Sequence, residues 1–269
     1  MHYLQYSTIK KLNLLLNKVN PFFSIITATY NSEKTLERTI ISVLNQSFTN
    51  FEYLIIDGNS KDATVEIVKK YVPIFNEKQI ALRYVSEPDK GIYDAWNKGI
   101  NLAKGEWISF LGSDDYYLDN ALEIYKRATA TNCNYIHSKV QLINEKQEKL
   151  RILGGDNFSK AKFFRNMNIA HVGSFHHKSL FENQKFSLTY KSASDYYFFL
   201  TNFNELKPYF INEITAVMQF GGISTNVDAA LKEAMQVKID SKRRSKFLCY
   251  LDFLVDHFKH FLLKYIRKT

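Results

Sequence analysis

The sequence contains little cysteine, no glycine-rich phosphate loop and no long apolar run. Its two cysteines, Cys133 and Cys249, stand far apart and without metal-ligand spacing, which indicates a reducing compartment and no disulfide framework. Neither G-x-G-x-x-G nor G-x-x-x-x-G-K-S/T occurs, so the usual dinucleotide and P-loop signatures are absent. No uncharged apolar stretch reaches the ~18 residues that a membrane-spanning helix needs.

The positive charge of the chain is concentrated near its end. The formal charge of the 269 residues is +9, and residues 241–269 hold eight Lys/Arg against two Asp. Such a basic segment on a nearly balanced body predicts an anionic partner surface, either a membrane or a nucleic acid. The overall composition, with 45% hydrophobic and 23% charged residues, is that of an ordinary globular protein.

The first half of the chain alternates between β-rich runs and amphipathic helical stretches. Strands are predicted at 22–29, 51–56, 82–85 and 107–111, with helices after Ser32 and over 63–71 and 92–103. This alternation predicts βαβ units and a parallel sheet. The second half is more mixed, with helices predicted at 120–129, 156–169 and 194–206 and strands at 135–144, 149–153, 170–177 and 211–220.

Both ends of the chain have helical patterns. Residues 1–20 predict a short basic amphipathic helix, and since no small-residue cleavage site follows, we expect no signal peptide. Near the other end, apolar residues line one side of a long helix with cations at its ends: Phe247, Leu251, Leu254, Phe258, Phe261, Leu262 and Tyr265. That side either lies on anionic lipid or packs against the preceding domain.

An acidic pair follows the predicted strand at 107–111. Asp114 and Asp115 come directly after Gly112 and Ser113. Ligands of open α/β sheets bind at the carboxyl ends of strands, and two adjacent carboxylates repel each other unless a cation compensates them. The pair therefore predicts a site for a divalent ion, and the alternative is an ordinary turn or helix cap.

Five motifs in order resemble family 2 glycosyltransferases with the GT-A fold: 24–31, 45–48, 51–62, 88–99 and 113–115. The run 88–99 is similar to the bacterial branch that builds colanic acid, other exopolysaccharides, capsules and lipopolysaccharide. The resemblance covers roughly 22–222. It implies an α/β fold with a Rossmann-like, mostly parallel central sheet flanked by helices. We expect a basic helix at 1–20, a GT-A domain at 21–225 with a nucleotide-sugar half (21–117) and an acceptor half (118–225), and a basic amphipathic helical region at 226–269.

The resemblance also implies an activity. The family transfers a sugar from a nucleoside-diphosphate sugar, expected here to be UDP-linked, to a glycan or lipid-linked glycan with inversion. The protein would then be a hexosyl- or N-acetylhexosaminyltransferase of cell-surface polysaccharide synthesis that uses Mn²⁺ or Mg²⁺. We expect it in the cytoplasm, on the inner face of the plasma membrane through 241–269, with no nucleic acid partner.

Individual residues are assigned by the same resemblance. Asp115 would hold the metal, although Ser113 replaces the first acid of the family's Asp-x-Asp motif. Asp57 would accept a hydrogen bond from the nucleotide base, and Asp114 would approach the ribose. The other expected donor contacts are Thr27, Ala28, Thr29, Tyr30, Lys90 and Asp94.

The catalytic base is expected to be Asp195, because Ser194-Asp195 matches the acid-Asp pair at a helix start in the family. An inverting transferase needs one carboxylate to accept the proton of the attacking hydroxyl. Alternatively, Asp195 is only a helix N-terminal aspartate. Among His171, His176 and His177, His177 is a candidate second metal ligand, although strand histidines are commonly core residues.

Two other functions stay open. A nucleotidyltransferase shares the α/β architecture and the acidic metal site, but it would carry a Gly-rich basic signature after the first strand. A non-enzymatic basic module would bind a membrane or nucleic acid through 241–269 and would have no donor site.

Overall fold

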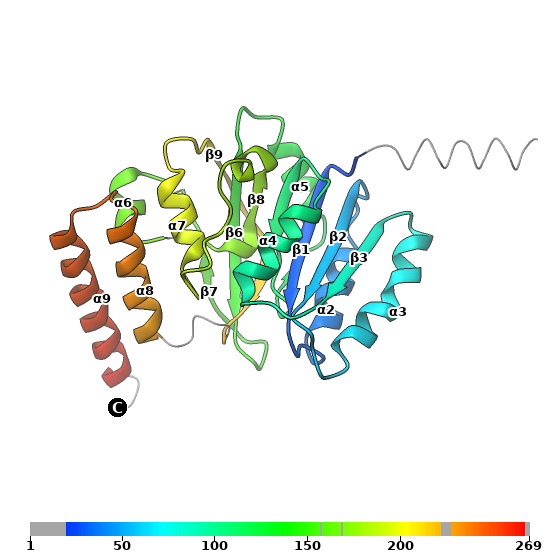
Figure 1. Cartoon of the computed structure of the whole chain (residues 1–269), viewed down its shortest axis with the longest axis horizontal. Helices are drawn as coiled ribbons and strands as arrows, with labels where there is room; N and C mark the ends of the chain where they lie inside the picture. Colours follow the sequence, from blue (N-terminus) through cyan, green and yellow to red (C-terminus); the bar gives the residue numbers. More distant parts are fainter. Residues whose placement is uncertain (1–19, 157, 168, 222–226, 267–269) are drawn as a thin grey trace, which may run out of the picture.

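A computed structural model describes residues 20–156, 158–167, 169–221 and 227–266. The helix predicted at 1–20 lies outside these residues except for its last position. In the described part, nine strands form one mixed sheet in the order β3-β2-β1-β4-β8-β6-β9-β5, with β7 paired to β6. Helices cover both faces of this sheet (Figure 1).

The first half of the chain forms the parallel part of the sheet, as its alternating pattern predicts. Its strands are β1 (Phe23–Thr29), β2 (Phe51–Asp57), β3 (Ala81–Ser86) and β4 (Trp107–Phe110). Thr29 pairs with Asp57, and Ile26 pairs with Phe110, so the carboxyl ends of these strands meet at one edge. Every residue of β2 is buried, because helices cover both of its sides.

The second half adds antiparallel pairs to the sheet. β8 (Ser174–His177) runs antiparallel to β4 and to β6 (Tyr135–Ile143), whereas β9 (Pro208–Gln219) runs parallel to β6. The short β5 (Tyr116–Tyr117) pairs with β9, and β7 (Lys149–Leu153) pairs with β6. The α/β class is confirmed, and the parallel pairing predominates in its first half.

Two apolar cores separate the sheet from its helix layers. Ile25 and Tyr53 point into one core, and Ile26 and Leu54 into the other, as strand alternation requires. The first core is covered by α2 (Leu36–Leu44), α3 (Thr64–Glu77) and α5 (Ala121–Ala128). The second is covered by α4 (Ile92–Leu102), α6 (Lys160–Arg165) and α7 (Ser194–Thr201).

Several predictions of local structure were wrong in extent: the helix predicted at 63–71 runs to Glu77, and the one predicted at 194–206 ends at Thr201. The helix predicted at 156–169 is only the six-residue α6. The strand predicted at 170–177 begins with a 3₁₀ turn, His171–Gly173, and only its second part is β8. This turn places His171 on the helix side of the sheet, where it packs against Trp96 and Phe110.

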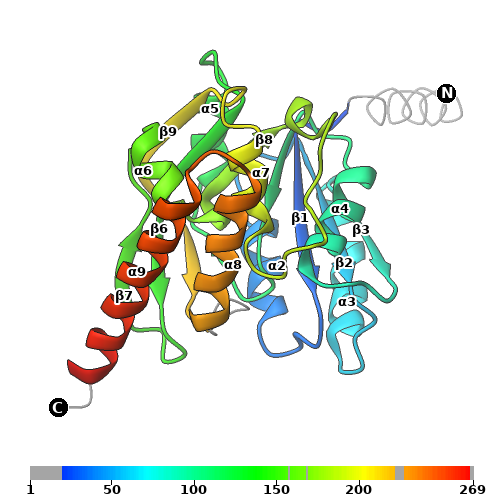
Figure 2. The same ribbon diagram turned by 60° about the vertical axis from the view of Figure 1, so that its left-hand side comes forward.

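The C-terminal region is a helical hairpin, α8 (Val227–Asp240) and α9 (Lys246–Ile266), at the side of the molecule beyond α7 (Figures 1 and 2). A buried carboxylate, Asp252 of α9, holds the hairpin together. It accepts two hydrogen bonds from Arg244 (2.7 and 2.9 Å) and pairs with Lys238 at 3.3 Å. Lys238 also donates to the carbonyl of Arg165, which ties the hairpin to α6.

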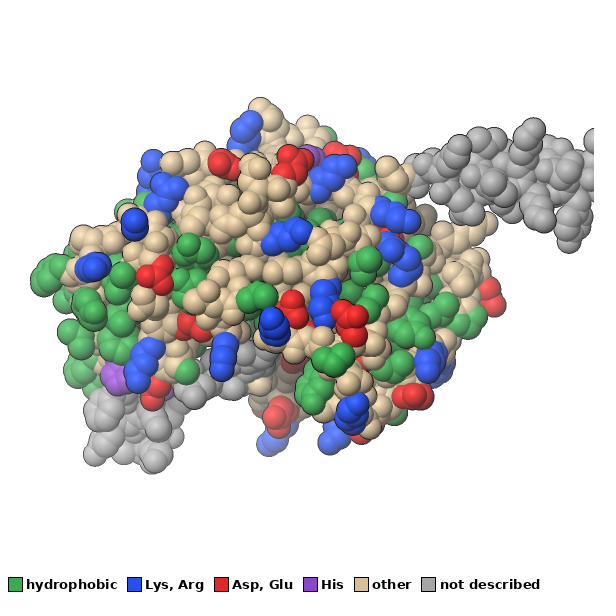
Figure 3. Space-filling view, in the orientation of Figure 1, with side chains coloured by type: hydrophobic (Ala, Val, Ile, Leu, Met, Phe, Trp, Pro, Cys, Tyr) green, Lys and Arg blue, Asp and Glu red, His purple; other side chains and the backbone are tan. Residues whose placement is uncertain are grey.

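The apolar side of α9 faces outward. Its inner side carries Cys249 and Asp252, whereas Phe247, Leu254 and Phe258 are 76%, 62% and 61% exposed. Hydrophobic side chains gather over this helix in Figure 3. The interpretation that this side packs against the preceding domain is therefore wrong for the described side chains. No described helix is long and apolar enough to cross a membrane.

Candidate active site

The acidic pair lies just beyond the end of β4. Asp115 is buried, and its Oδ1 accepts a hydrogen bond from the backbone N–H of Gln219 (2.9 Å) at the end of β9. Burial and the neighbouring Asp114 raise the pKa of Asp115 to about 8, and burial also raises the pKa of Asp114. Arg38 of α2 offsets this only in part, with a hydrogen bond to the Asp114 carbonyl (2.8 Å). The protein thus does little to stabilise the state in which both carboxylates are ionised.

The turn before the pair is shaped by Gly112 and Ser113. A Cβ on Gly112 would lie 2.5 Å from Asp115 Oδ2, so no larger residue fits unless the carboxylate moves. Ser113, which stands where the family has an acid, shares a 2.9 Å hydrogen bond with the Ser32 hydroxyl. This bond ties the turn to the segment leading into α2.

The donor set at this turn fits a hard divalent cation. Carboxylate oxygens are the ligands that Mg²⁺ and Mn²⁺ prefer, and a bound cation would offset the burial and mutual repulsion that raise the pKa values of the pair. Among the described residues, no group of three or more His, Cys, Asp or Glu side chains could hold a metal. Asp114 and Asp115 can therefore supply only part of a coordination shell.

His177 does not belong to this site. It pairs with Trp107 at the start of β4, whereas Asp115 follows the other end of that strand. Its Nδ1 bonds the Ser179 hydroxyl at 2.8 Å, and its Nε2 lies 3.7 Å from Glu106. His177 is not retained as a second metal ligand, because the length of β4 separates the two residues.

Asp57 lies at the end of β2, on the same edge as the acidic pair. Its carboxylate accepts hydrogen bonds from the Ser60 N–H (3.0 Å), the Ser60 hydroxyl (2.5 Å) and the Ser86 hydroxyl (2.6 Å). These bonds fix its orientation. A carboxylate has about four acceptor positions, so Asp57 can still accept one donor from a ligand.

The residues around the end of β1 divide between this edge and the core. Thr27 is fully buried and bonds the Tyr53 hydroxyl at 3.0 Å, so its side chain lies in the core, contrary to its expected donor contact. Ala28 packs partly against the second core. Thr29 pairs with Asp57, and its buried hydroxyl has no hydrogen-bond partner among the described residues. Tyr30 is 62% exposed.

The loop after β3 supplies Lys90 and Asp94. The Lys90 N–H donates to Asp94 Oδ2 (3.0 Å), and Asp89 accepts from the N–H of Gly91, which has a φ of +112°. Glycine adopts this conformation at little cost. A Cβ on Gly58 would lie 2.7 Å from Asp89 Oδ2, so this loop touches the turn after Asp57. Lys90 is exposed beside that turn.

Asp195 lies in the first turn of α7 and is 8% exposed. Its Oδ1 accepts hydrogen bonds from the Tyr93 hydroxyl (3.0 Å) and the Tyr196 N–H (2.8 Å). Its Oδ2 accepts none from the described residues and lies 3.9 Å from His171 Nδ1. Burial raises the pKa of Asp195 to about 6. A carboxylate with one fixed and one unengaged oxygen and a pKa near neutrality can accept a proton from a substrate.

Tyr93 and His171 are neighbours of Asp195 that the sequence did not assign to the site. Burial lowers the pKa of His171 to about 3, so its ring is neutral. That ring stacks on Phe110 with centroids 5.3 Å apart, which connects Asp195 to the end of β4 and the acidic turn. Tyr93 lies in the 88–99 motif, but its contact with Asp195 spans 102 positions, and no pattern in the sequence predicts it.

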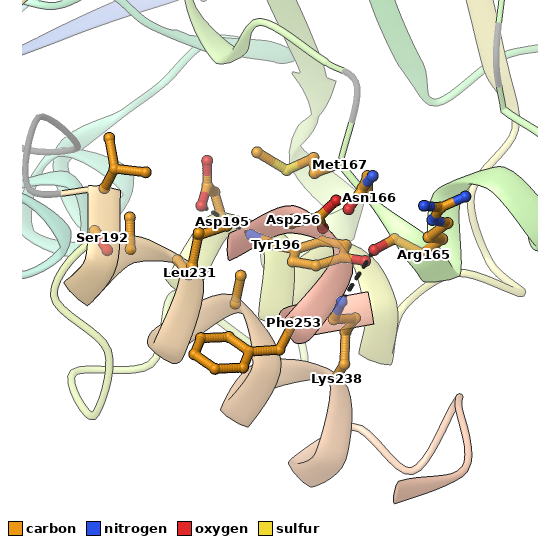
Figure 4. Close-up of a pocket in the computed structure, with 14 residues that line it drawn as sticks. Arg165, Asn166, Met167, Ser192, Asp195, Tyr196, Leu231, Lys238, Phe253 and Asp256 are labelled. Atoms are coloured by element: carbon orange, nitrogen blue, oxygen red, sulfur yellow. Dashed lines mark hydrogen bonds between the residues drawn. The ribbon is translucent and has the colours of Figure 1, made fainter. Parts of the chain in front are cut away.

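Asp195 also lines a pocket of about 410 Å³ that lies among α6, α7, α8 and α9. Figure 4 shows Asp195 toward one side and Arg165 toward the other, with Met167, Tyr196 and Asp256 between them and Leu231 and Phe253 below Asp195. Met167 completes the apolar wall. The catalytic candidate thus connects, through His171 and Phe110, to the acidic turn and also lines a second pocket with apolar and charged walls.

The comparison with known families decides the classification. The family model "Glycosyl transferase family 2" matches residues 24–186, which is more than half of the chain. The chain belongs to this family. It is therefore a glycosyltransferase, and neither the nucleotidyltransferase nor the non-enzymatic basic module is retained.

Curated relatives of this glycosyltransferase act in several pathways. It is 28% identical over 211 residues to a PGL/p-HBAD biosynthesis glycosyltransferase of Mycobacterium tuberculosis, covering 77% of this chain and 80% of the relative. It is 29% identical over 179 residues to WfgD of Escherichia coli, a UDP-Glc:alpha-D-GlcNAc-diphosphoundecaprenol beta-1,3-glucosyltransferase. This match covers 66% of this chain and 68% of the relative.

Solved structures confirm the GT-A fold. A crystal structure of Staphylococcus aureus TarS 1-349 in complex with UDP-GlcNAc superposes with a TM-score of 0.67 at 18% identity, covering 88% of this chain and 72% of that one. The mannosyltransferase PcManGT of Pyrobaculum calidifontis, in complex with GDP-Man and Mn²⁺, superposes with a TM-score of 0.63 at 16% identity, covering 85% of this chain and 66% of that one.

Proposed function

We propose that this glycosyltransferase transfers a hexosyl or N-acetylhexosaminyl group from a UDP-sugar to a glycan or lipid-linked glycan, with inversion and with Mn²⁺ or Mg²⁺ as cofactor, in cell-surface polysaccharide synthesis. The observation that carries the proposal is Asp195. It is a buried carboxylate with a pKa of about 6, it has one oxygen without a hydrogen bond from the described residues, and His171 and Phe110 connect it to the acidic turn. The relatives that bind or use UDP-sugars favour the UDP donor.

Each acidic residue then has one task. Asp57 accepts a hydrogen bond from the base, Thr29 and Tyr30 border it, and Asp114 binds the ribose. Lys90 faces the diphosphate, and Asp94 holds the loop that carries Lys90. Asp115 would hold the divalent ion, which stabilises negative charge on the leaving diphosphate when it is bound.

Asp195 acts on the acceptor. Its Oδ1 stays bonded to Tyr93 and Tyr196, while Oδ2 takes the proton of the acceptor hydroxyl as that oxygen attacks the anomeric carbon. Attack from the face opposite the leaving nucleotide inverts the anomeric configuration. Neutral His171 limits the access of water to Asp195 without adding charge.

A donor screen tests the proposal. Hydrolysis of UDP-, GDP- and dTDP-sugars and their thermal shifts are measured with and without Mn²⁺. We expect a shift and slow hydrolysis with a UDP-sugar only when the metal is present. If no nucleotide sugar gave a metal-dependent signal, the proposed donor site would be abandoned.

We further propose that the outward side of α9 lies on an anionic membrane, at the inner face of the plasma membrane. Asp252 is buried and paired and Asp256 is half-buried, whereas Lys246 and Lys259 are exposed on the helix together with its apolar side chains. That arrangement is typical of interfacial helices.

Co-sedimentation with phosphatidylglycerol vesicles tests this surface. A Leu254→Ser/Phe258→Ser variant is expected to bind roughly tenfold more weakly or worse, because two exposed apolar side chains no longer enter the lipid. The matched control, Leu150→Ser/Ile152→Ser, removes two similarly exposed side chains from β7 and should bind normally. Equal binding of both variants would contradict the membrane surface.

A further inference from the structure

The pocket beside Asp195 has a lining distinct from the donor edge. Its lining comes from α6, the start of α7, α8 and α9, and includes none of the residues expected to bind the nucleotide. Among the described residues of the proposed catalytic machinery, the lining includes Asp195 and Tyr196, whose N–H holds Asp195 Oδ1. A pocket placed in this way can hold a molecule whose hydroxyl reaches Asp195 from the acceptor side.

One part of the pocket wall is apolar, and polar or charged side chains, among them Arg165, Lys238 and Asp256, line the rest. Met167, Leu231, Ala234 and Phe253 form the apolar part of the wall, and the small side chains of Ala230 and Ala234 leave the space open on α8. Apolar side chains cannot replace the hydrogen bonds that sugar hydroxyls make with water, so this wall disfavours a free oligosaccharide. An alkyl chain or an aromatic ring would gain from burial there.

The helices that form the wall are held in place from several sides. Glu233 of α8 accepts hydrogen bonds from the N–H groups of Lys191 and Ser192 and from the Ser192 hydroxyl, all at 2.6 Å. This carboxylate fixes α8 to the segment just before Asp195. Tyr190 donates to Asp240 at 2.7 Å near the other end of the helix. The pocket is therefore formed by helices whose positions relative to α7 are fixed by these hydrogen bonds.

We infer that this pocket binds the apolar carrier of the acceptor, so that the substrate is a glycoside on an alkyl or aryl group and presents a sugar hydroxyl to Asp195. The inference rests on the proposed function, which makes Asp195 the base. It also explains the position of α9. Phe253 lines the pocket and the adjacent Leu254 is on the outward side, so one helix connects a lipid surface to the acceptor pocket.

The test compares octyl β-D-glucopyranoside, below its micelle concentration, with methyl β-D-glucopyranoside, by calorimetry and saturation-transfer NMR on the full chain. We expect the octyl glycoside to bind at least tenfold more tightly. Ala234→Trp, which fills the pocket, should weaken octyl binding at least tenfold, and Leu231→Asn should weaken it severalfold while remaining easier to fold. Leu254→Ser/Phe258→Ser should bind it as the parent does.

Two results would overturn the inference. One is equal binding of the two glycosides. The other is loss of octyl binding in Leu254→Ser/Phe258→Ser together with normal binding in folded Ala234→Trp or Leu231→Asn, which would place the detergent on the outside of α9. Metal-dependent hydrolysis of a UDP-sugar by the parent enzyme separates these failures from failure of the proposed function, because it requires no acceptor.

Discussion

Each half of the molecule contributes to the site a buried carboxylate with a raised pKa, Asp115 and Asp195, and the two differ in what raises that pKa. Asp115, beyond the parallel half, has a pKa of about 8 because burial is combined with repulsion from Asp114. Asp195, on α7, has a pKa of about 6 through burial, partly offset by hydrogen bonds from Tyr196 and Tyr93. Asp115 belongs to a pair of neighbouring carboxylates, whereas Asp195 is a single carboxylate that accepts hydrogen bonds on one of its oxygens.

This difference assigns the two residues different chemistry. A pair of carboxylates with raised pKa values becomes fully charged at neutral pH when a cation binds, so Asp115 suits a metal. A single carboxylate that titrates near neutrality exchanges a proton readily, so Asp195 suits a base. Substituting each carboxylate by its amide should therefore have different effects on donor binding and on turnover.

The largest effect is expected for Asp195→Asn. The amide keeps the shape of the side chain and can still accept the Tyr93 hydrogen bond, but it cannot take a proton. Turnover should fall by roughly 10²–10⁴-fold, the usual contribution of a general base. Binding of the metal and the UDP-sugar, measured by thermal shift, should be unchanged.

The control for this variant is Asp228→Asn, which changes an exposed aspartate of α8. Its turnover should stay within about twofold of the parent value. Near-normal turnover of Asp195→Asn would remove Asp195 from the role of base and leave it as a helix N-terminal aspartate.

Asp115→Asn is expected to weaken donor binding and at the same time to stabilise the apo protein. Metal-dependent affinity for the donor should fall at least about tenfold, because one carboxylate of the cation site is gone. The apo protein should become more stable at pH 8. A carboxyl whose pKa is raised on folding disfavours the folded state increasingly as the pH rises from 3.8 toward 8, and the amide removes this cost.

Thermal denaturation at two pH values measures the stability change. We expect the free energy of unfolding to rise by at least about 1 kcal/mol at pH 8 and by less at pH 5, since each pKa unit corresponds to ~1.4 kcal/mol. Asp119→Asn, an exposed site four residues away, should show neither change. A stability loss in Asp115→Asn at pH 8 would contradict an uncompensated charge pair.

The same contrast explains how much of the site the sequence could predict. Asp57, Asp114 and Asp115 follow strands whose order and direction can be recognised from local patterns, and parallel strands bring their carboxyl ends to one edge. The exception is Thr27, which stands two residues after Ile25 and so faces the same core. Strand alternation could have revealed this.

The second half was less predictable for physical reasons. The contact of Tyr93 with Asp195 depends on how α4 and α7 share one core, and no sequence period encodes that. The pattern of α9 shows that one side is apolar, but not whether that side faces protein or lipid. Its direction follows from the buried pairing of Asp252 with Lys238 and Arg244.

The smallest and most specific effect is expected for Tyr93→Phe. The Tyr93 hydroxyl stabilises the charged form of Asp195 and so lowers its pKa against the effect of burial. Without it, the pKa of Asp195 should rise, and the acidic limb of the pH–rate profile should move upward by up to about one unit. Turnover at pH 6 should fall severalfold, whereas turnover at pH 8.5 should change little, because Asp195 is ionised there in both proteins.

Tyr197→Phe changes a tyrosine of the same helix layer that has no hydrogen bond to Asp195 in the described structure, and it should leave the profile in place. Equal losses at both pH values in Tyr93→Phe would mean that Tyr93 supports the packing of α4 on α7 and does not tune the base.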